Sequence, residues 1–209
     1  MPVGRQARPA GPGSLAGGSE RESRVWRTMT VARYLAFLRG INVGGKNKLP
    51  MEELRAMFVA AGCDDVQTYI QSGNVIFGAA PDVVSTVPGV ITARIAADFR
   101  YRVPVIVRTA AELAGVLERN PFVPTGAAAE ALHVMFLAAH PAADRVARLD
   151  PRRSPPDAFA VRGQEVYLHL PNGMARTKLT NAYIDTTLDT TSTARNWRTV
   201  STLRTLLGA

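Results

Sequence analysis

The sequence contains one cysteine, few aromatic residues and no long apolar run. A single cysteine cannot form a disulfide within the chain, so Cys63 favours a reducing compartment, and we expect its thiol to be buried and inert. No segment approaches the roughly 20 consecutive apolar residues of a membrane-spanning helix. The N-terminal arginines precede no apolar stretch of the kind found in signal peptides. We therefore predict a cytoplasmic protein that has no membrane partner.

Groups of metal-binding or catalytic residues are also lacking. The histidines His133, His140 and His169 are isolated, and none has the spacing of a metal-ligand set. There is no Gly-x-Ser-x-Gly motif, no obvious Cys–His pair and no pair of carboxylates placed for acid–base catalysis. We therefore expect neither a metal nor a cofactor. The sequence assigns no catalytic residue and leaves an enzymatic activity open.

Acidic residues are fewer than basic ones: the sequence has 17 Asp and Glu residues and 25 Lys and Arg residues, which gives a formal net charge of +8. This excess favours phosphorylated ligands, nucleic acid or an acidic surface as partners, but it does not predict a fold. Residues 1–29 hold five arginines and two glutamates, so they carry +3 (5 − 2 = 3) of that charge. Gly, Pro and Ser dominate this segment, and we interpret it as a disordered extension.

Hydrophobic patterns beyond residue 30 predict an α+β protein. Apolar runs at 33–39 and 103–107 and a hairpin at 66–77 are typical of strands, and amphipathic helices separate them. The resulting order, β-α-β-β-α-β, is that of the ferredoxin-like fold. Pro88 lies within the second helical segment, so we expect it to kink that helix or to mark its first turn.

A similar series returns in the second half of the chain. Thr109 and Glu112 form a capping-box pattern that predicts a connecting helix. Beyond it, the order β-α-β-β-α repeats but ends in a helix where the first series has a strand. We predict two tandem ferredoxin-like (α/β-plait) modules with an extra C-terminal helix; the predicted segments are 30–108 for the first module, 109–130 for the connecting helix and linker, and 131–209 for the second module.

The glycine-rich segment Gly40–Lys48 follows a strand and precedes a helix, as a phosphate-binding loop does. A P-loop needs Ser or Thr after its lysine to bind magnesium, whereas Asn47 follows Lys46 here, so we reject a P-loop nucleotide hydrolase. Exposed backbone N–H groups and two lysines still favour an anion. The alternative is a tight turn that uses glycine for its positive φ and leaves the lysines in solvent.

Two later segments also place basic residues at the starts of helices. Thr177, between Arg176 and Lys178, and Asn196, after Arg195, are the N-caps that we expect. Cations in a first turn oppose the helix dipole, so two such cases favour helix N-termini that hold an external anion together with basic side chains. The alternative is that these side chains reach internal carboxylates or water.

Five motifs resemble those of one known family. They are Arg39–Asn47, Thr68–Val75, Asn120–Phe122, Thr177–Thr180 and Thr193–Trp197. In this order they closely resemble the bacterial family called domain of unknown function 1697, over about Val31 to the C-terminus. The resemblance implies tandem ferredoxin-like modules and no particular activity. The N-terminal extension and Pro88 depart from the family pattern.

Our leading hypothesis is a protein that binds a phosphorylated or carboxylated small molecule. The backbone N–H groups and Lys46 would hold the anion, Arg195 would clamp it, and Asn42 and Asn47 would orient the rest of the ligand. The alternatives are a nucleic-acid-binding module with its charge spread over a sheet face, and a structural or dimerising protein in which the motifs fix the packing of two modules. The expected site residues are Arg39, Asn42, Gly44, Gly45, Lys46, Asn47, Tyr69, Gln71, Ser72, Asn74, Thr177, Lys178, Arg195 and Asn196.

Overall fold

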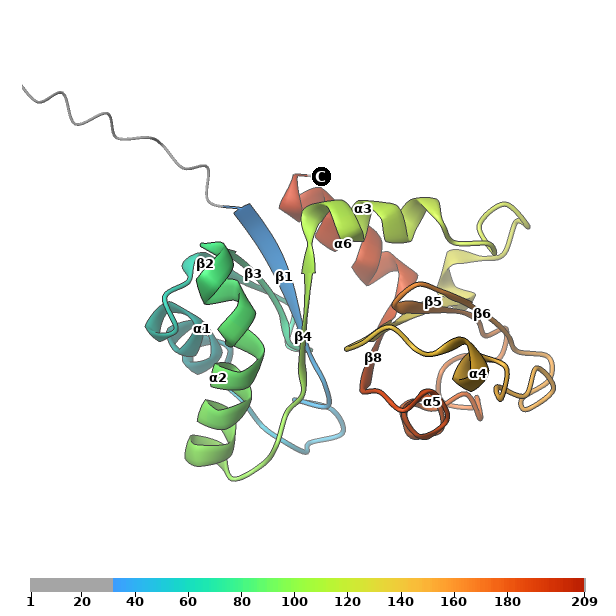
Figure 1. Cartoon of the computed structure of the whole chain (residues 1–209), viewed down its shortest axis with the longest axis horizontal. Coiled ribbons are helices and arrows are strands. Elements are labelled where there is room, and N and C mark those ends of the chain that lie inside the picture. The colour runs from blue at the N-terminus through green and yellow to red at the C-terminus, as the bar shows by residue number, and fades with distance from the viewer. Residues whose placement is uncertain (1–31, 209) are drawn as a thin grey trace, which may run out of the picture. The chain divides into compact units, whose positions relative to one another are not determined.

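The structure is a computed structural model that describes residues 32–208 (Figure 1). The disorder predicted for residues 1–29 lies outside the described residues. Eight strands, six α-helices and one short 3₁₀ turn make up the described part. In chain order they are β1 (Ala32–Leu38), α1 (Met51–Ala60), β2 (Asp64–Tyr69), β3 (Asn74–Ala79), α2 (Pro81–Phe99), β4 (Val105–Thr109), α3 (Ala110–Glu118), the 3₁₀ turn (Ala129–Ala131), β5 (Leu132–Leu137), α4 (Ala143–Val146), β6 (Ala158–Arg162), β7 (Glu165–His169), α5 (Asn181–Leu188), β8 (Ser192–Asn196) and α6 (Trp197–Leu207).

The strands form two antiparallel sheets of four strands each. The first sheet has the order β2-β3-β1-β4, and the second has the equivalent order β6-β7-β5-β8. The predicted α+β class is confirmed in this form. The prediction that the second series ends without a fourth strand is wrong, because Ser192–Asn196 pairs with β5 as β8. The two halves of the described chain therefore match strand for strand.

Strand β1 contributes to two hydrophobic cores, because successive side chains of a strand point to opposite faces of the sheet. Tyr34, Ala36 and Leu38 pack in the first core, with residues of α1 and α2. Leu35 and Phe37 point to the opposite face and belong to a second core. Figure 1 shows α1 and α2 along the first sheet. Burial on both faces explains why β1 is apolar from Tyr34 to Leu38.

The second core joins the two sheets. Phe37 and Ile76 of the first sheet pack there with Phe136 and Tyr167 of the second, and apolar residues of α3 and α6 complete it. A third core covers the other face of the second sheet, where residues such as Leu168 pack with α5. Both faces of each sheet are therefore covered by packed side chains.

Helix boundaries follow local signals with some exceptions. The capping box at α3 is confirmed, since Thr109 accepts a hydrogen bond from the Glu112 amide and the Glu112 carboxylate accepts one from the Thr109 amide. Helix α2 begins at Pro81 and continues through Pro88, so Pro88 does not mark its first turn. Helix α4 is a single turn of four residues. Among residues 32–208, no helix combines the length and apolar character needed to cross a membrane.

Candidate functional site

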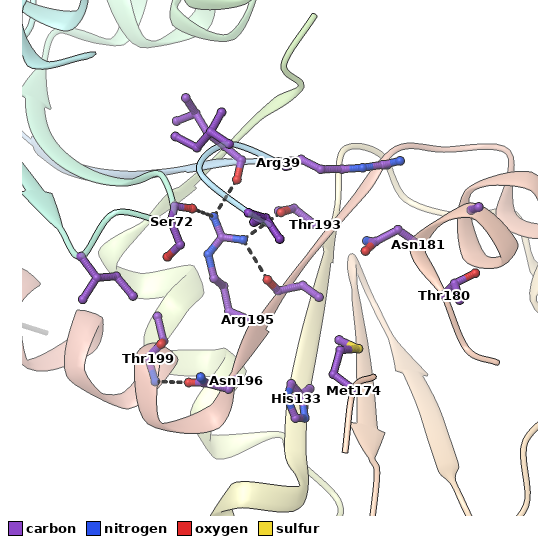
Figure 2. A pocket seen from close by; sticks show the side chains of 17 residues that line it. Arg39, Ser72, His133, Met174, Thr180, Asn181, Thr193, Arg195, Asn196 and Thr199 are labelled. Atoms are coloured by element: carbon purple, nitrogen blue, oxygen red, sulfur yellow. Dashed lines mark hydrogen bonds between the residues drawn. The ribbon is translucent and has the colours of Figure 1, made fainter. Parts of the chain in front are cut away.

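A cavity of about 710 Å³ lies where the end of β1 meets β8 and the starts of α5 and α6 (Figure 2). Its volume falls in the range of small-molecule sites, which is roughly 300–1,000 Å³. Apolar and polar side chains share the wall. The lining residues are Leu38, Arg39, Gly40, Ile41, Val43, Ile70, Ser72, His133, Met174, Thr180, Asn181, Ala182, Thr193, Ala194, Arg195, Asn196 and Thr199.

Arg195 of β8 occupies the centre of this wall and binds the first sheet (Figure 2). Its side chain spans the space between the sheets, so it meets the end of β1 and the turn between β2 and β3. All five N–H groups of the guanidinium have acceptors. The acceptors are the Asn74 Oδ1 atom (2.6 Å), the backbone oxygens of Leu38 (2.8 Å), Ser72 (3.0 Å), Gly73 (3.2 Å) and Ala194 (2.8 Å), and the Thr193 Oγ1 atom (2.9 Å).

The charge of Arg195 has no carboxylate partner among residues 32–208, because every acceptor is neutral. The residue is only 8% exposed. Burial lowers the pKa of the Arg195 guanidinium to about 10, since removal from water disfavours the charged form. The guanidinium also lies 5.2 Å from the centre of the Phe37 ring. The carbonyl dipoles and the ring face stabilise the cation without neutralising it.

Arg108 of β4, in the first sheet, makes the equivalent contacts with the second sheet. It lies over the Phe136 ring, as Arg195 lies over Phe37, and it binds the end of β5 and the turn between β6 and β7. The difference is at Nε, which donates to the Glu165 carboxylate, whereas Nε of Arg195 donates to an amide. The acceptors of Arg108 are the Glu165 Oε1 atom (3.1 Å) and the backbone oxygens of Val107 (3.0 Å), Leu137 (2.7 Å) and Gln164 (3.2 Å).

Arg39, the other arginine of the cavity wall, is already neutralised. Its guanidinium forms an ion pair with Asp185 of α5 and donates to the Ser192 backbone oxygen at 3.1 Å. The Asp185 carboxylate also accepts hydrogen bonds from the Ser192 amide and hydroxyl. None of the described residues that line the cavity is Asp or Glu. Arg195 is therefore the source of uncompensated positive charge in this wall.

The glycine-rich loop is a tight turn held by its own asparagines. Gly40, Asn42, Gly44, Gly45 and Asn47 all have positive φ values. The Asn42 side chain donates to the backbone oxygens of Leu49 and Gln71 and accepts from the Leu49 amide, and Asn47 donates to the Gly40 oxygen. Both amide groups of the asparagines thus donate to the backbone. The loop brings Gly40 and Val43 to the cavity wall.

The predicted site residues fall into three groups. Arg39, Ser72, Arg195 and Asn196 line the main cavity, and Asn74 lies behind it as a buried partner of Arg195. Asn42, Gly45 and Gln71 line a second cavity of about 450 Å³. Neither lining includes the remaining residues, which are Gly44, Lys46, Asn47, Tyr69, Thr177 and Lys178.

The predicted start of α5 is wrong by three residues. Thr180, not Thr177, is the N-cap, because the Thr180 hydroxyl accepts from the Tyr183 amide. Thr177 is buried and accepts from the Leu179 amide in a turn before the helix. Lys178 is exposed. The predicted cap of α6 is confirmed, since the Asn196 side chain accepts from the Thr199 amide at 2.7 Å.

Sequence reasoning missed several residues of the cavity wall. His133 of β5 lines the wall, burial lowers its pKa, and its Nδ1 atom is buried with no hydrogen-bond partner among the described residues. Val43 and Ile70 are exposed apolar residues at the same wall. Asn181 and Ala182 open α5. No sequence motif connects these positions, because the cavity forms only when the two sheets meet.

Comparison with known proteins identifies a family and a fold. The family described as "Protein of unknown function (DUF1697)" matches residues 31–167. A solved structure, of a conserved bacterial protein from Streptococcus pneumoniae (SP0830), is similar with a TM-score of 0.65 and 22% identity, over 84% of this chain and 98% of that chain. No curated protein matches the chain. Since the family match covers more than half of the sequence, the chain belongs to the DUF1697 family of proteins of unknown function.

Proposed function

We propose that this protein binds a small anionic molecule, phosphorylated or carboxylated, in the cavity beside Arg195. The observation that carries the proposal is the contrast between the two buried arginines. Arg108 has the Glu165 carboxylate as its partner, whereas Arg195 has only neutral acceptors in the described chain and borders a cavity. A buried cation without a counter-ion attracts an anion strongly, because the low dielectric of the interior screens its charge poorly.

The helix starts at the cavity add to this attraction. Asn181 and Ala182 are the first two residues of α5, and both line the wall. Backbone N–H groups at a helix N-terminus point outward and favour negative charge. Because the N–H groups of Arg195 already have acceptors, its contribution is electrostatic attraction, and the direct donors come from α5 and from polar side chains of the wall. Lys46 and Lys178 add long-range attraction only.

A structural role for the same residues has its own support. Arg195 joins β8 to β1 and to the turn between β2 and β3, so it helps to hold the two sheets together. Such a role would require no ligand. A nucleic-acid-binding role has less support, because it would place charge on an open sheet face, and both faces of each sheet pack in hydrophobic cores.

At the level of the fold, we propose that the two halves are tandem ferredoxin-like modules, at residues 30–108 and 131–209, with the helix and linker of 109–130 between them. The support is the shared strand order, β2-β3-β1-β4 and β6-β7-β5-β8, and the β-α-β-β-α-β succession in both halves. Helix α6 is then the extra C-terminal helix. The cavity would lie between modules.

Binding of anions can be measured by thermal shift and titration calorimetry with phosphorylated and carboxylated metabolites, inorganic phosphate and sulfate. We expect at least one anion to raise the melting temperature. Asn74→Asp should reduce its affinity about tenfold or more, because a carboxylate at Arg195 Nε neutralises the cation, and a tenfold change corresponds to about 1.4 kcal/mol. Gln67→Glu is the matched control, since it adds the same charge at an exposed position of β2.

A second variant separates binding from folding. Ala182→Glu places a carboxylate at the exposed start of α5, where the helix dipole stabilises it. We expect the variant to keep its melting temperature and to lose anion binding. If no anion binds the native protein, or if both Asn74→Asp and Ala182→Glu bind as tightly as the native protein, the proposal is wrong and the structural role is favoured.

A further inference from the structure

The mouth of the main cavity carries two exposed apolar side chains. Val43 of the glycine-rich loop is 63% exposed, and Ile70, in the turn that follows β2, is 51% exposed. Both line the cavity. We call this pair the apolar rim. Single exposed apolar residues are common in folded proteins, so exposure alone assigns the rim no role.

The backbone of Ile70 gives a second and independent reason to consider the rim. Ile70 has a φ of +50°. Left-handed backbone is unfavourable for residues with a branched Cβ atom, whereas Gly or Asn adopts it readily. Ile70 therefore raises the energy of the backbone, and its side chain does not belong to any of the three hydrophobic cores. An isoleucine at this position does not stabilise the turn.

Strained residues that the fold does not need are typical of ligand sites. The wall below the rim continues the apolar surface with Ile41, Met174 and Ala194, and Arg195 lies in the same wall. A cavity of about 710 Å³ is much larger than an inorganic anion needs. The cavity thus presents an uncompensated cation and an apolar surface to one occupant.

We infer that the ligand is an amphipathic anion, with a compact acidic group near Arg195 and the start of α5 and an aromatic or branched aliphatic body against Val43 and Ile70. This inference rests on the proposed anion binding and specifies its ligand class. The acidic group satisfies the charge of the wall, and the body covers apolar side chains that otherwise face water.

The test uses two fluorescent probes and one simple ion. Anilinonaphthalene sulfonate carries an aromatic body and an anionic group, phenylnaphthylamine carries the same rings without the charge, and inorganic phosphate carries the charge without the rings. We expect the native protein to bind the sulfonate more tightly than either of the others. Ile70→Asn should weaken sulfonate binding about tenfold or more, the change expected when one buried aliphatic side chain is lost.

The same variant tests whether Ile70 is retained for the fold. Asn tolerates left-handed backbone, so Ile70→Asn should raise the melting temperature by about 2–4 °C while it weakens binding. Val43→Thr, which keeps the shape and replaces one methyl group by a hydroxyl, should weaken binding without a loss of stability. Val59→Thr is the matched control, since Val59 on α1 is 60% exposed and lies outside the cavity.

The outcomes separate this inference from the proposal on which it rests. If phosphate binds, Asn74→Asp weakens its binding about tenfold or more and Ile70→Asn leaves the sulfonate affinity unchanged, the protein binds anions but the apolar rim has no part in it. If phenylnaphthylamine binds as tightly as the sulfonate and Asn74→Asp has no effect, the anion proposal itself is wrong. A lower melting temperature for Ile70→Asn would show that Ile70 serves the fold, and would overturn the inference.

Discussion

The rings of Phe37 and Phe136 stack face to face, with centroids 4.1 Å apart and an interplanar angle of 20°. Each ring lies on an inner strand of its own sheet, at equivalent positions of β1 and β5. Each also lies beneath the arginine that arrives from the other sheet, Arg195 over Phe37 and Arg108 over Phe136. The junction between the sheets is thus a pair of stacked rings with a guanidinium on each.

The two rings should contribute to stability as a coupled pair. We expect Phe37→Leu and Phe136→Leu each to lower the free energy of unfolding, and the double variant to lose less than the sum, with a coupling of about 0.5–1.5 kcal/mol. Urea denaturation of the four proteins measures this coupling. Strictly additive losses would show that the stacking contributes nothing beyond burial.

Replacement of Glu165, the carboxylate partner of Arg108, should strongly lower the stability of the fold. In Glu165→Gln, Arg108, which is 4% exposed, keeps a hydrogen-bond acceptor but loses its counter-ion. Breaking a buried ion pair from one side costs several kcal/mol, so we expect a loss of about 3 kcal/mol in unfolding free energy. Denaturation in urea measures the loss. A loss below about 1 kcal/mol would mean that water hydrates the Arg108 guanidinium and replaces the pairing.

Both the backbone conformation of Gly73 and its neighbours disfavour any larger residue at this position. Its φ is +74°, and an added Cβ would lie 2.6 Å from the Leu38 Cβ atom and 2.9 Å from the Ile41 Cδ1 atom. Gly126 has a similar φ of +78° but open space around it. We expect Gly126→Ala to cost about 1 kcal/mol and Gly73→Ala about 3 kcal/mol, because only the latter adds overpacking to backbone strain. Equal losses in chemical denaturation would contradict the packing argument.

Cys63 should react slowly in the folded protein and weaken the fold at alkaline pH. Burial, followed by the charge of Asp64, raises the pKa of its thiol from 9.0 to about 11. At pH 8 this shift leaves about 100-fold less thiolate, so a thiol-specific disulfide reagent should react about 100-fold more slowly with the native than with the unfolded protein.

The same shift predicts a pH dependence of stability. A raised pKa means that the folded state holds the proton more tightly, so the stabilisation is complete below pH 9 and is lost as the pH rises towards 11. Cys63→Ala should lose less stability over this range. A thiol that reacts equally fast in both states, or an identical pH dependence in Cys63→Ala, would show that the thiol is accessible.

Local signals predicted those parts of the fold that depend on neighbouring residues. The helix after Asn196 and the capping box at Thr109 follow from side chains three residues apart, and the structure has both. Strand β8 was missed because Ser192–Asn196 contains few apolar residues. Its buried polar side chains are satisfied by partners that the sequence does not reveal, such as Asp185 for Ser192.

The role of Arg195 depends on even more distant partners. Leu38, Ser72 and Gly73, whose oxygens it binds, lie more than 120 positions away in the chain. One signal was present in the sequence, because an arginine directly precedes an N-cap residue in both halves, at Arg108-Thr109 and Arg195-Asn196. The cavity itself could not be predicted from the sequence, since its wall joins segments from both sheets.

Arg108 and Arg195 each reach into the opposite sheet, so each half of the chain supplies hydrogen-bond partners to the other. A fragment ending before β5 would leave the carbonyls of Leu38 and Ser72 without the Arg195 donor, and would leave Arg108 with only the Val107 oxygen as an acceptor. The same holds in reverse for a fragment that starts at β5. Neither half of the described chain therefore has all of its hydrogen-bond partners without the other, and a substitution at one end of the junction changes the contacts of residues at the other.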